Sequence, residues 1–391
     1  MDIFITGYGV ISSIGKNVEE TYATLLTEKS AIQQGKKKHT ERFKVGEIHS
    51  SNAELMQTFG LKTVGSRTAL LGMIAAKEAF AGHEFRSDVR TGLISGTSVG
   101  GMDVSEEEYK TEYNGEKSNP VMYLHHPSGT TTEQIATELG LTGFVNTIST
   151  ACSSAANAIM MGARMIRTGQ LDRVIVGGTD CMTNFTISGF RSLMIFDTDF
   201  CRPFDESRKG LNLGEGAGFL VIESAESMKK TNKQALAKLS GWSNASDAFH
   251  QTASSPEGFG AVLAMRKALQ VANLQPEEID YINAHGTATP NNDLSESKAF
   301  LTVFDGKVPA FSSTKAYTGH TLAACGGIEA VIALLSIQHR TLFPNLNHVT
   351  PIEETGLTPV KTVQENVDIQ HVLSNSFGFG GNNSTLIISK I

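Results

Sequence analysis

Short apolar runs bounded by glycine alternate with long, nearly uniformly apolar helical segments along most of this chain. This alternation is typical of βαβ units built around a buried parallel or mixed sheet. The segments Ser153–Thr168 and Leu322–His339 are rich in Ala, Met, Ile or Leu on most faces, and Thr68–Phe80 is similar. A helix that is apolar nearly all round has no side for solvent, so it must lie between layers. The sequence therefore predicts an α/β protein with helices inside it.

The same patterns predict individual elements. Expected strands are Ile3–Thr6, Gly92–Ser95, Arg173–Val176, Gly218–Glu223, Asp280–Ala284, Pro309–Ser312, His371–Asn375 and Thr385–Ser389. Expected helices are Ser66–Phe80, Ser153–Thr168, Gly258–Val271, Leu294–Phe304 and Leu322–His339.

The order of these elements indicates an internal duplication. On each side of the polar stretch Glu226–Gln234, a strand, a long helix, another strand, a reactive-looking loop and a buried helix follow one another. We therefore expect one half at residues 1–234 and a second at residues 235–391. The first half is longer, and its surplus lies in Gly96–Thr132 and Cys181–Leu213. Ordinary connections are short, so loops of this length are expected to be functional.

Composition excludes several classes of protein. The 391 residues contain 33 Lys and Arg against 40 Asp and Glu, a net charge of -7, so no overall attraction for nucleic acid or anionic membrane is expected. Four cysteines without CxxC spacing favour a reducing compartment. The N-terminus has no basic and apolar leader pattern, and no segment is expected to span a bilayer. We therefore expect a cytoplasmic protein.

The segment TACSSAANAI places Cys152 between a short extended stretch and a buried helix. A helix N-terminus carries unpaired N–H groups and partial positive charge, which favour thiolate over thiol. The same amides can donate to an oxyanion. A small buried core cysteine is the alternative interpretation, and this segment alone barely favours the functional one.

Two further loops carry histidines. INAHGTATPNND delivers His285 from a strand end into a loop with Thr287 and Thr289, where α/β proteins often place ligand-handling groups. STKAYTGHTLAACGGIEA puts His320 just before a nearly all-apolar helix whose one charge in Leu322–Gln338 is Glu329. Such a buried carboxylate needs a partner, and Lys315 is the obvious candidate. That ion pair is compatible with a purely structural role as well as with catalysis.

Glycine-rich turns occur in SNSFGFGGNNS and LGEGAG. Glycine permits positive φ and close backbone approach to a substrate. Neither turn is followed by Lys-Ser or Lys-Thr or opens a helix as a phosphate loop does, so nucleotide binding is rejected for both.

Taken together, these segments resemble the β-ketoacyl-acyl-carrier-protein synthases of the thiolase superfamily, most of all the elongating enzymes of bacterial fatty-acid synthesis. The resemblance covers essentially the whole chain. In the family's order it includes ITGYGVISSIG, GTSVGG, TACSSA, RPFDESRKGLNLGEGAGFLVIE, HGTATP, TKAYTGH and FGFGGNN. It implies a thiolase-like five-layered αβαβα sandwich of two duplicated halves, normally a homodimer.

The resemblance also implies the central roles. Cys152 matches the acylated nucleophile, and His285 and His320 match the family's histidine pair, which would stabilise the enolate formed by malonyl decarboxylation. Lys315 matches the active-site lysine, and Glu329 matches its buried carboxylate. The implied product is a 3-oxoacyl chain on an acyl carrier protein, with substrates carried on phosphopantetheine and with no metal or redox cofactor.

Other roles implied by the resemblance concern substrate binding. Thr287 and Thr289 match threonines that hold the pantetheine arm. Phe379 matches a gating phenylalanine whose amide completes the oxyanion hole with that of Cys152. By the same resemblance, Val99 and Phe190 are expected near the acyl tunnel, where they would set chain length. An acidic carrier protein would dock on basic side chains, for which the candidates are Lys62, Arg67 and Arg208.

Departures from the family pattern leave the pathway open between fatty-acid synthesis and secondary metabolism, including polyene-type systems. Asn292, Cys325 and Asn382–Asn383 stand where glycine, a small apolar residue and Thr-Asn are usual, and Met122–Pro127 is also atypical.

Four alternatives share parts of the pattern. A thiolase would carry a second reactive cysteine near the C-terminal glycine turn, and an initiating synthase would have asparagine for one histidine. An inactive chain-length factor would lack the nucleophile, although this chain could pair with such a subunit as a heterodimer. A cysteine hydrolase would release acid without malonyl-carrier.

Overall fold

Ten strands form the main sheet of the computed structural model, which describes residues 2–62 and 65–391. Their order across the sheet is β10-β9-β11-β12-β8-β1-β7-β6-β4-β5, and β2 and β3 form a separate small pair. The strands are β1 (Ile3–Ser12), β2 (Gln33–Gln34), β3 (Lys44–Val45), β4 (Thr91–Gly96), β5 (Phe144–Ile148), β6 (Arg173–Asp180), β7 (Gly216–Ser224), β8 (Ala237–Ser246), β9 (Tyr281–Asn283), β10 (Ala310–Ser312), β11 (His371–Gly378) and β12 (Asn382–Ser389).

The expected duplication is confirmed by the topology of this sheet. In the first half β4 lies parallel to β5 and β6, and β7 runs antiparallel to β6 and β1. In the second half β9 lies parallel to β10 and β11, and β12 runs antiparallel to β11 and β8. The halves join through β1 and β8, where Phe4 pairs with Lys238 and Ile5 with Ala237. Each half is therefore the same five-stranded unit.

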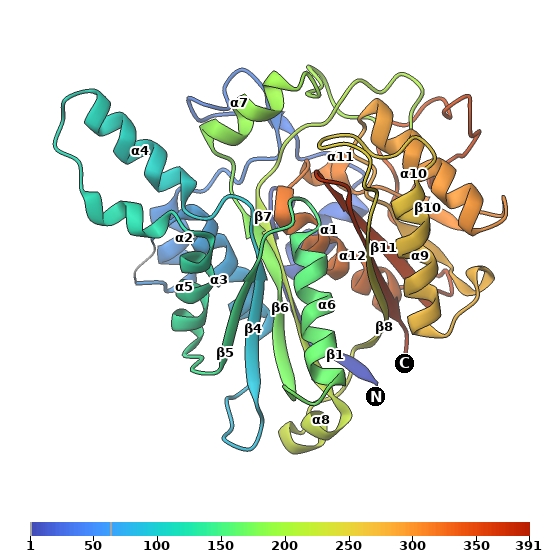
Figure 1. Ribbon diagram of the computed structural model, residues 1–391, viewed down its shortest axis with the longest axis horizontal. Helices are drawn as coiled ribbons and strands as arrows, with labels where there is room; N and C mark the ends of the chain where they lie inside the picture. Colours follow the sequence, from blue (N-terminus) through green and yellow to red (C-terminus); the bar gives the residue numbers. More distant parts are fainter. Residues whose placement is uncertain (1, 63–64) are drawn as a thin grey trace.

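Helices fill the remaining layers (Figure 1). They are α1 (Val18–Leu26), α2 (Asn52–Phe59), α3 (Arg67–Ala79), α4 (Met102–Tyr113), α5 (Ser128–Leu139), α6 (Ser154–Arg167), α7 (Asn184–Ser192), α8 (Ala225–Thr231), α9 (Phe259–Ala272), α10 (Pro290–Val303), α11 (Lys315–Thr318) and α12 (Cys325–His339), with short 3₁₀ segments η1 (Pro120–His125), η2 (Pro276–Glu278) and η3 (Leu322–Ala324).

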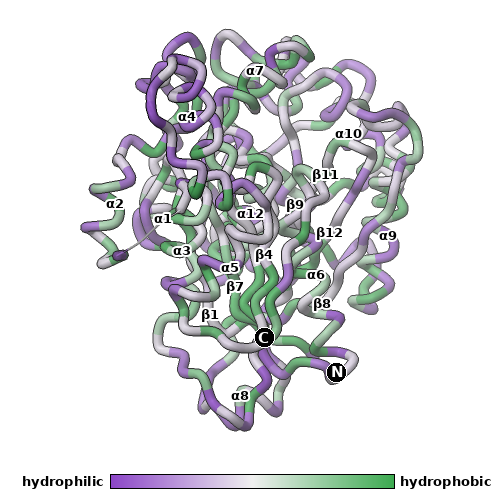
Figure 2. The backbone as a smooth tube through the Cα atoms, turned by 60° about the vertical axis from the view of Figure 1, so that its left-hand side comes forward, coloured by the Kyte–Doolittle hydropathy of each residue, from purple (hydrophilic) through white to green (hydrophobic). Residues whose placement is uncertain are grey.

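The middle layer consists of α6 and α12, which pack on each other and on strands of both halves. On the outer faces, α3 covers β1, β7 and β6, while α9 covers β8 and β12 and supports α10. This is the αβαβα sandwich implied by the resemblance. Figure 2 shows hydrophobic strands in the middle of the molecule and a hydrophilic α4 at its surface.

The central helix α12 corrects one expectation from the sequence. Leu322–His339, which spans η3 and α12, reaches the length and mean hydropathy (1.5) of a membrane span, although no segment was expected to do so. However, 89% of this 18-residue segment is buried inside the protein. The apolar composition therefore reflects burial between the two five-stranded halves of the sheet, as the all-round apolar pattern predicts.

Two other expectations need correction. The long loops expected in the first half contain helices α4 and α7, the 3₁₀ segment η1 and the beginning of α5. Strands β5 and β8 went unpredicted because FVNTI is short and partly polar, and AKLSGWSNAS has only one well-buried face. The polar join expected at Glu226–Gln234 is largely α8; the boundary at 234/235 falls between α8 and β8 and stays a prediction.

The parallel strands of both halves end at one place. In the first half, β4, β5 and β6 lead to Thr97, Cys152 and Asp180, and in the second half β9, β10 and β11 lead to His285, Lys315 and Phe379. Ligand sites of open α/β sheets form at the carboxyl ends of their strands.

Candidate active site

Cys152 lies in a tight turn between β5 and α6. The preceding Ala151 has a φ of +52°, and Ser153 is the N-cap residue of α6. Cys152 is 6% exposed and lines a cavity of about 390 Å³. Burial raises the pKa of its thiol to about 12, although Lys315 and the backbone amides of Phe379 and Cys152 pull it down. The resting group is a thiol, in contrast to the thiolate favoured at a helix N-terminus, because enclosure outweighs those amides.

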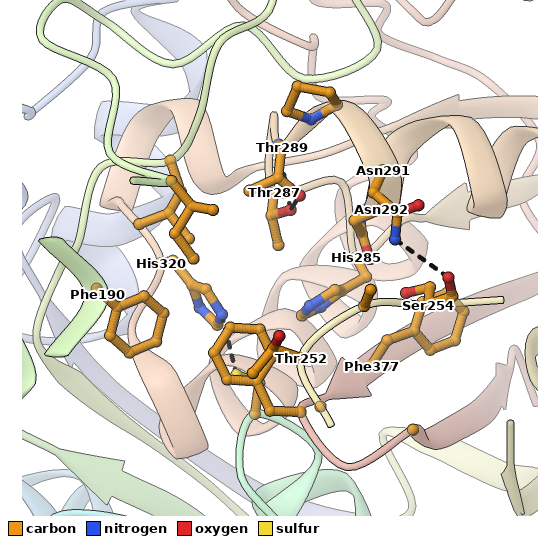
Figure 3. A pocket seen from close by; sticks show the side chains of 18 of the residues that line it. Phe190, Thr252, Ser254, His285, Thr287, Thr289, Asn291, Asn292, His320 and Phe377 are labelled. Atoms are coloured by element: carbon orange, nitrogen blue, oxygen red, sulfur yellow. Dashed lines mark hydrogen bonds between the residues drawn. The ribbon is translucent and has the colours of Figure 1, made fainter. Parts of the chain in front are cut away.

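His320 points into the same cavity (Figure 3), directly beside this thiol. Its Nε2 lies 3.1 Å from the Cys152 Sγ, and its Nδ1 accepts the Leu322 backbone N–H at 3.3 Å. Burial, reinforced by Lys315, lowers the pKa of His320 well below its ordinary value. A neutral imidazole whose Nδ1 accepts carries its proton on Nε2. His320 therefore presents an N–H donor to the cavity.

His285 reaches the same cavity from the end of β9. Its ring centroid lies 5.4 Å from that of His320, with the ring planes at 87°. The Lys315 Nζ lies 3.3 Å from the His285 Nδ1, and an ammonium can only donate there. Burial, Lys315 and His320 lower the pKa of His285 well below its ordinary value. His285 is thus a second neutral imidazole with its proton on Nε2.

The expected ion pair between Lys315 and Glu329 is present and buried. Burial disfavours the ammonium, but the attraction of Glu329 outweighs it and raises the pKa of Lys315. Burial also raises the pKa of Glu329 to about 7. Lys315 and Glu329 do not line the cavity. Lys315 contacts the Nδ1 side of the His285 ring, and Glu329 pairs with Lys315.

One set of potential metal ligands occurs among residues 2–62 and 65–391. His285, Cys325 and Glu329 offer ligand atoms within 4.8 Å of one another. The Lys315 ammonium already lies against His285 and Glu329, and its charge interacts with Cys325. The lysine therefore supplies the positive charge that this group of acceptors favours.

The glycine-rich turn places Phe379 over the nucleophile. Its backbone amide lies near enough to the Cys152 sulfur to lower the pKa of the thiol, as does the amide of Cys152 itself. The Phe379 ring stacks on Phe190 with centroids 5.5 Å apart, and both rings line the cavity. Two amides beside one sulfur are the arrangement that an oxyanion hole requires.

Of the four residues expected to bind substrate, three line the cavity and one does not. Thr287 and Thr289 line the cavity with their Oγ1 atoms 2.9 Å apart. Phe190 lines it from α7, whereas Val99 packs in the apolar cluster behind α7 and its amide binds Asp180 at 3.0 Å. The roles of all four in binding or chain length stay predictions.

Two buried carboxylates that position this site were missed by the sequence interpretation. Glu296 on α10 accepts the backbone N–H groups of His285 and Gly286 at 2.9 and 2.8 Å, and burial raises its pKa to about 7. Asp180 at the end of β6 accepts from Thr97 at 2.6 Å and from the Ala323 amide at 2.9 Å. Neither stands in a quoted motif, because only the fold brings their partners close.

Of the three residues expected to dock an acidic carrier protein, Arg67 is contradicted by the structure. It is 6% exposed, and its guanidinium binds Glu215 through Nε and Nη2 at 2.9 and 2.8 Å. An arginine held in that way cannot meet a carrier protein. Lys62 is exposed and Arg208 is half-buried. The basic side chain that lines the cavity is that of Lys209, which is not among the three expected residues.

Family models match the chain on both sides of its join. "Beta-ketoacyl synthase, N-terminal domain" matches residues 1–228, and "Beta-ketoacyl synthase, C-terminal domain" matches residues 236–349. The chain belongs to the beta-ketoacyl synthase family.

Known relatives and solved structures agree with this membership. This synthase is 34% identical over 405 residues to 3-oxoacyl-[acyl-carrier-protein] synthase 2 of Staphylococcus aureus (strain COL), covering 99% of this chain and 98% of the relative. The ishigamide ketosynthase/chain length factor structure is 30% identical, with a TM-score of 0.91 over 100% of this chain and 99% of that one. A chain in the structure of the ketosynthase ApeO in complex with its chain length factor ApeC, from Xenorhabdus doucetiae, is 30% identical, with a TM-score of 0.86 and coverage of 100% of this chain and 98% of that one.

Proposed function

We propose that this synthase condenses malonyl-acyl-carrier protein, with loss of CO₂, onto an acyl group held on Cys152. The product is a 3-oxoacyl-acyl-carrier protein for fatty-acid or polyketide synthesis. The observation that carries this proposal is the Cys152 Sγ lying 3.1 Å from the His320 Nε2 in a cavity that His285 also lines. The name of the Staphylococcus aureus relative describes the same reaction class.

The first stage transfers the acyl group. The Cys152 sulfur attacks the thioester carbon of the carrier's phosphopantetheine, and the thiol proton leaves with the departing carrier sulfur. The negative charge on the thioester oxygen is held by the amides of Cys152 and Phe379. Splitting one difficult condensation into two transfers is the benefit of a covalent intermediate.

The second stage makes the carbon–carbon bond. The malonyl carboxyl group leaves as CO₂, and its electron pair passes into an enolate whose oxygen accepts the Nε2–H groups of His285 and His320. The enolate carbon then attacks the acyl thioester, and the Cys152 sulfur leaves as a thiolate that takes up one proton from water to restore the thiol. Preorganised donors of this kind typically lower a barrier by about 3–4 kcal/mol each. Neutral imidazoles suit this role because an imidazolium would protonate the enolate.

The tautomers of the histidines follow from their neighbours. Lys315 holds the His285 proton on Nε2, and the Leu322 amide does the same for His320. Because Lys315 supplies the positive charge behind His285, we propose a reaction without a metal or redox cofactor. Thr287 and Thr289, on the cavity wall, would bind the pantetheine arm.

Partners and location are part of the same proposal. The carrier is an acyl carrier protein, and the synthase works beside a second thiolase-like subunit, as a homodimer or as a heterodimer with a chain-length-factor-like protein. Two similar structures at 30% identity contain a ketosynthase and its chain length factor, which supports the heterodimer. The four free cysteines suit the cytosol, where we place the protein.

Intact-protein mass spectrometry after incubation with a panel of acyl-carriers tests the proposal. We expect a mass increase equal to one acyl group, mapped to Cys152 and absent from Cys152→Ala. Addition of malonyl-carrier should discharge the adduct into a 3-oxoacyl product. An adduct on another residue, or acid released without malonyl-carrier, would refute the mechanism in favour of another nucleophile or a hydrolase.

A further inference from the structure

A network of amide and hydroxyl side chains joins the two halves behind the Cys152 turn. Its centre is Asn382, whose Oδ1 accepts from the Ser153 Oγ at 2.6 Å, the Asn244 Nδ2 at 2.7 Å and the Asn157 Nδ2 at 2.9 Å. The Asn157 Oδ1 in turn accepts from the Ser384 Oγ at 2.6 Å. One acceptor thus serves donors from the nucleophile turn, from α6 and from β8.

The network also fixes the nucleophile turn internally. The Ser153 Oγ lies 2.7 Å from the Thr150 carbonyl oxygen, and the Asn157 Nδ2 donates to the Thr150 Oγ1 at 2.8 Å. Ser153 is fully buried and Asn157 is 6% exposed. Buried polar groups of this kind rigidify a structure when each finds its partners, and they are costly when a partner is removed.

Asn382 stands at the base of the turn that carries Phe379. It pairs with Gly378 in the β11–β12 register, so residues 379–381 form the turn, in which Gly380 and Gly381 have φ values of +85° and +77°. A Cβ on Gly378 would lie 2.8 Å from the Thr150 carbonyl oxygen and 3.1 Å from the Cys152 nitrogen. The turn therefore rests directly on the backbone of the nucleophile.

We propose that Asn382 is a positioning residue that holds the Phe379 amide at the separation from the Cys152 amide that the thioester oxyanion needs. This rests on the proposed acylation of Cys152. Gly381 and Phe379 line the cavity but Asn382 does not, so it acts through the turn and not on substrate. The two oxyanion donors come from different halves of the chain, and Asn382 links those halves at the point where the donors meet.

The identity of this side chain matters to the proposal. The threonine expected here from the family resemblance has its hydroxyl oxygen on a shorter side chain, and that hydroxyl also carries a proton of its own. It would not reach the same three donors from the position of the Asn382 Oδ1. Asn382 therefore holds the nucleophile turn, α6 and β8 together, whereas a threonine at this position would hold only some of them.

Comparison of acylation with alkylation of Cys152 tests the proposal. Acylation forms an oxyanion, whereas alkylation by iodoacetamide displaces iodide at a saturated carbon and forms none. In Asn382→Ala we expect the maximal rate of acylation to fall about 10- to 100-fold, since a shift of about 1 Å can cost 10²-fold. The carrier concentration at half-maximal rate should stay within about twofold of wild type. The alkylation rate should fall clearly less than the acylation rate, because alkylation depends on the Phe379 amide only through the thiolate content of Cys152.

Two further variants complete the experiment. Asn382→Thr should show a smaller loss of acylation, again with a lesser loss of alkylation, and it keeps the test valid if the alanine variant does not fold. Asn114→Ala makes the same substitution at an exposed residue after α4 and should change neither rate.

Three results would separate the possible failures. Equal losses of acylation and alkylation in both Asn382 variants would show a general disturbance of the nucleophile turn and overturn the proposal. Unchanged acylation in both would overturn it as well. Absence of acylation in the wild-type protein would instead refute the proposed function.

Discussion

The two halves of this synthase have the same strand order but contribute different chemistry to the cavity. In the first half the strand ends supply the Cys152 thiol and the Asp180 carboxylate that fixes neighbouring loops. In the second half they supply His285, the Lys315 support and the Phe379 amide. In the proposed mechanism the first half therefore carries the acyl group, and the second half supplies both imidazoles and one of the two oxyanion amides.

Each half also contains a buried pair of a basic side chain and a glutamate, and the comparison of these two pairs separates structure from catalysis. Arg67 and Glu215 in the first half bind through two nitrogens, away from the cavity, and the pKa of Glu215 is lowered to about 2 even though burial opposes this. Lys315 and Glu329 in the second half lie behind His285, and burial raises the pKa of Glu329 to about 7. The first carboxylate is held ionised, whereas the second can accept a proton near neutral pH.

The largest expected effect follows from this difference. Arg67→Ala removes the main group that holds the buried Glu215 carboxylate ionised and leaves only Lys37, at 3.4 Å, as a neighbouring cation, so we expect a loss of about 3–5 kcal/mol in the free energy of unfolding. Lys315→Ala should lose less stability, because Glu329 can become neutral, but should impair decarboxylation. Urea unfolding measures both. The control Arg86→Ala removes an exposed pair with Asp88 and should change stability by less than about 1 kcal/mol. Equal losses from Arg67 and Lys315 would contradict the comparison.

The division of labour between the halves predicts the next effect. His285→Ala or His320→Ala should slow malonyl decarboxylation by about 10²–10³-fold, because each removes one donor to the enolate oxygen. Acylation of Cys152 should fall much less, since its oxyanion uses backbone amides. CO₂ release and acyl-adduct formation, measured separately, distinguish the two steps. An equal loss of both would defeat the assignment.

The smallest expected effect is a pH dependence of the thiol. Because its pKa is raised to about 12, the thiolate fraction should increase with pH throughout the neutral range. The rate of iodoacetamide alkylation should then rise about tenfold per pH unit from 7 to 9, without a plateau. The histidines, whose pKa values are lowered, should add no step near pH 6.5. A plateau below pH 8 would instead indicate a thiolate stabilised in the resting enzyme.

The sequence by itself determined the strands with long apolar runs, the buried helices α6 and α12 and the order of the motifs. Their periodicity is a local property, and it directly reflects burial on one face or on all faces. Strands β5 and β8 were not predicted from the sequence. Both are partly polar, and such a strand is recognisable only beside its pairing partner, which lies far away in the chain.

Only the tertiary structure decided how these residues behave chemically. It buried Arg67, which a list of basic residues offers as a docking site, and it gave Glu296 and Asp180 the partners that make them part of the site. It also set the protonation of Cys152, whose helix N-terminus alone favours a thiolate. The reason is that desolvation and hydrogen bonding depend on atoms brought together from both halves of the chain, whereas the local pattern records only which residues are available.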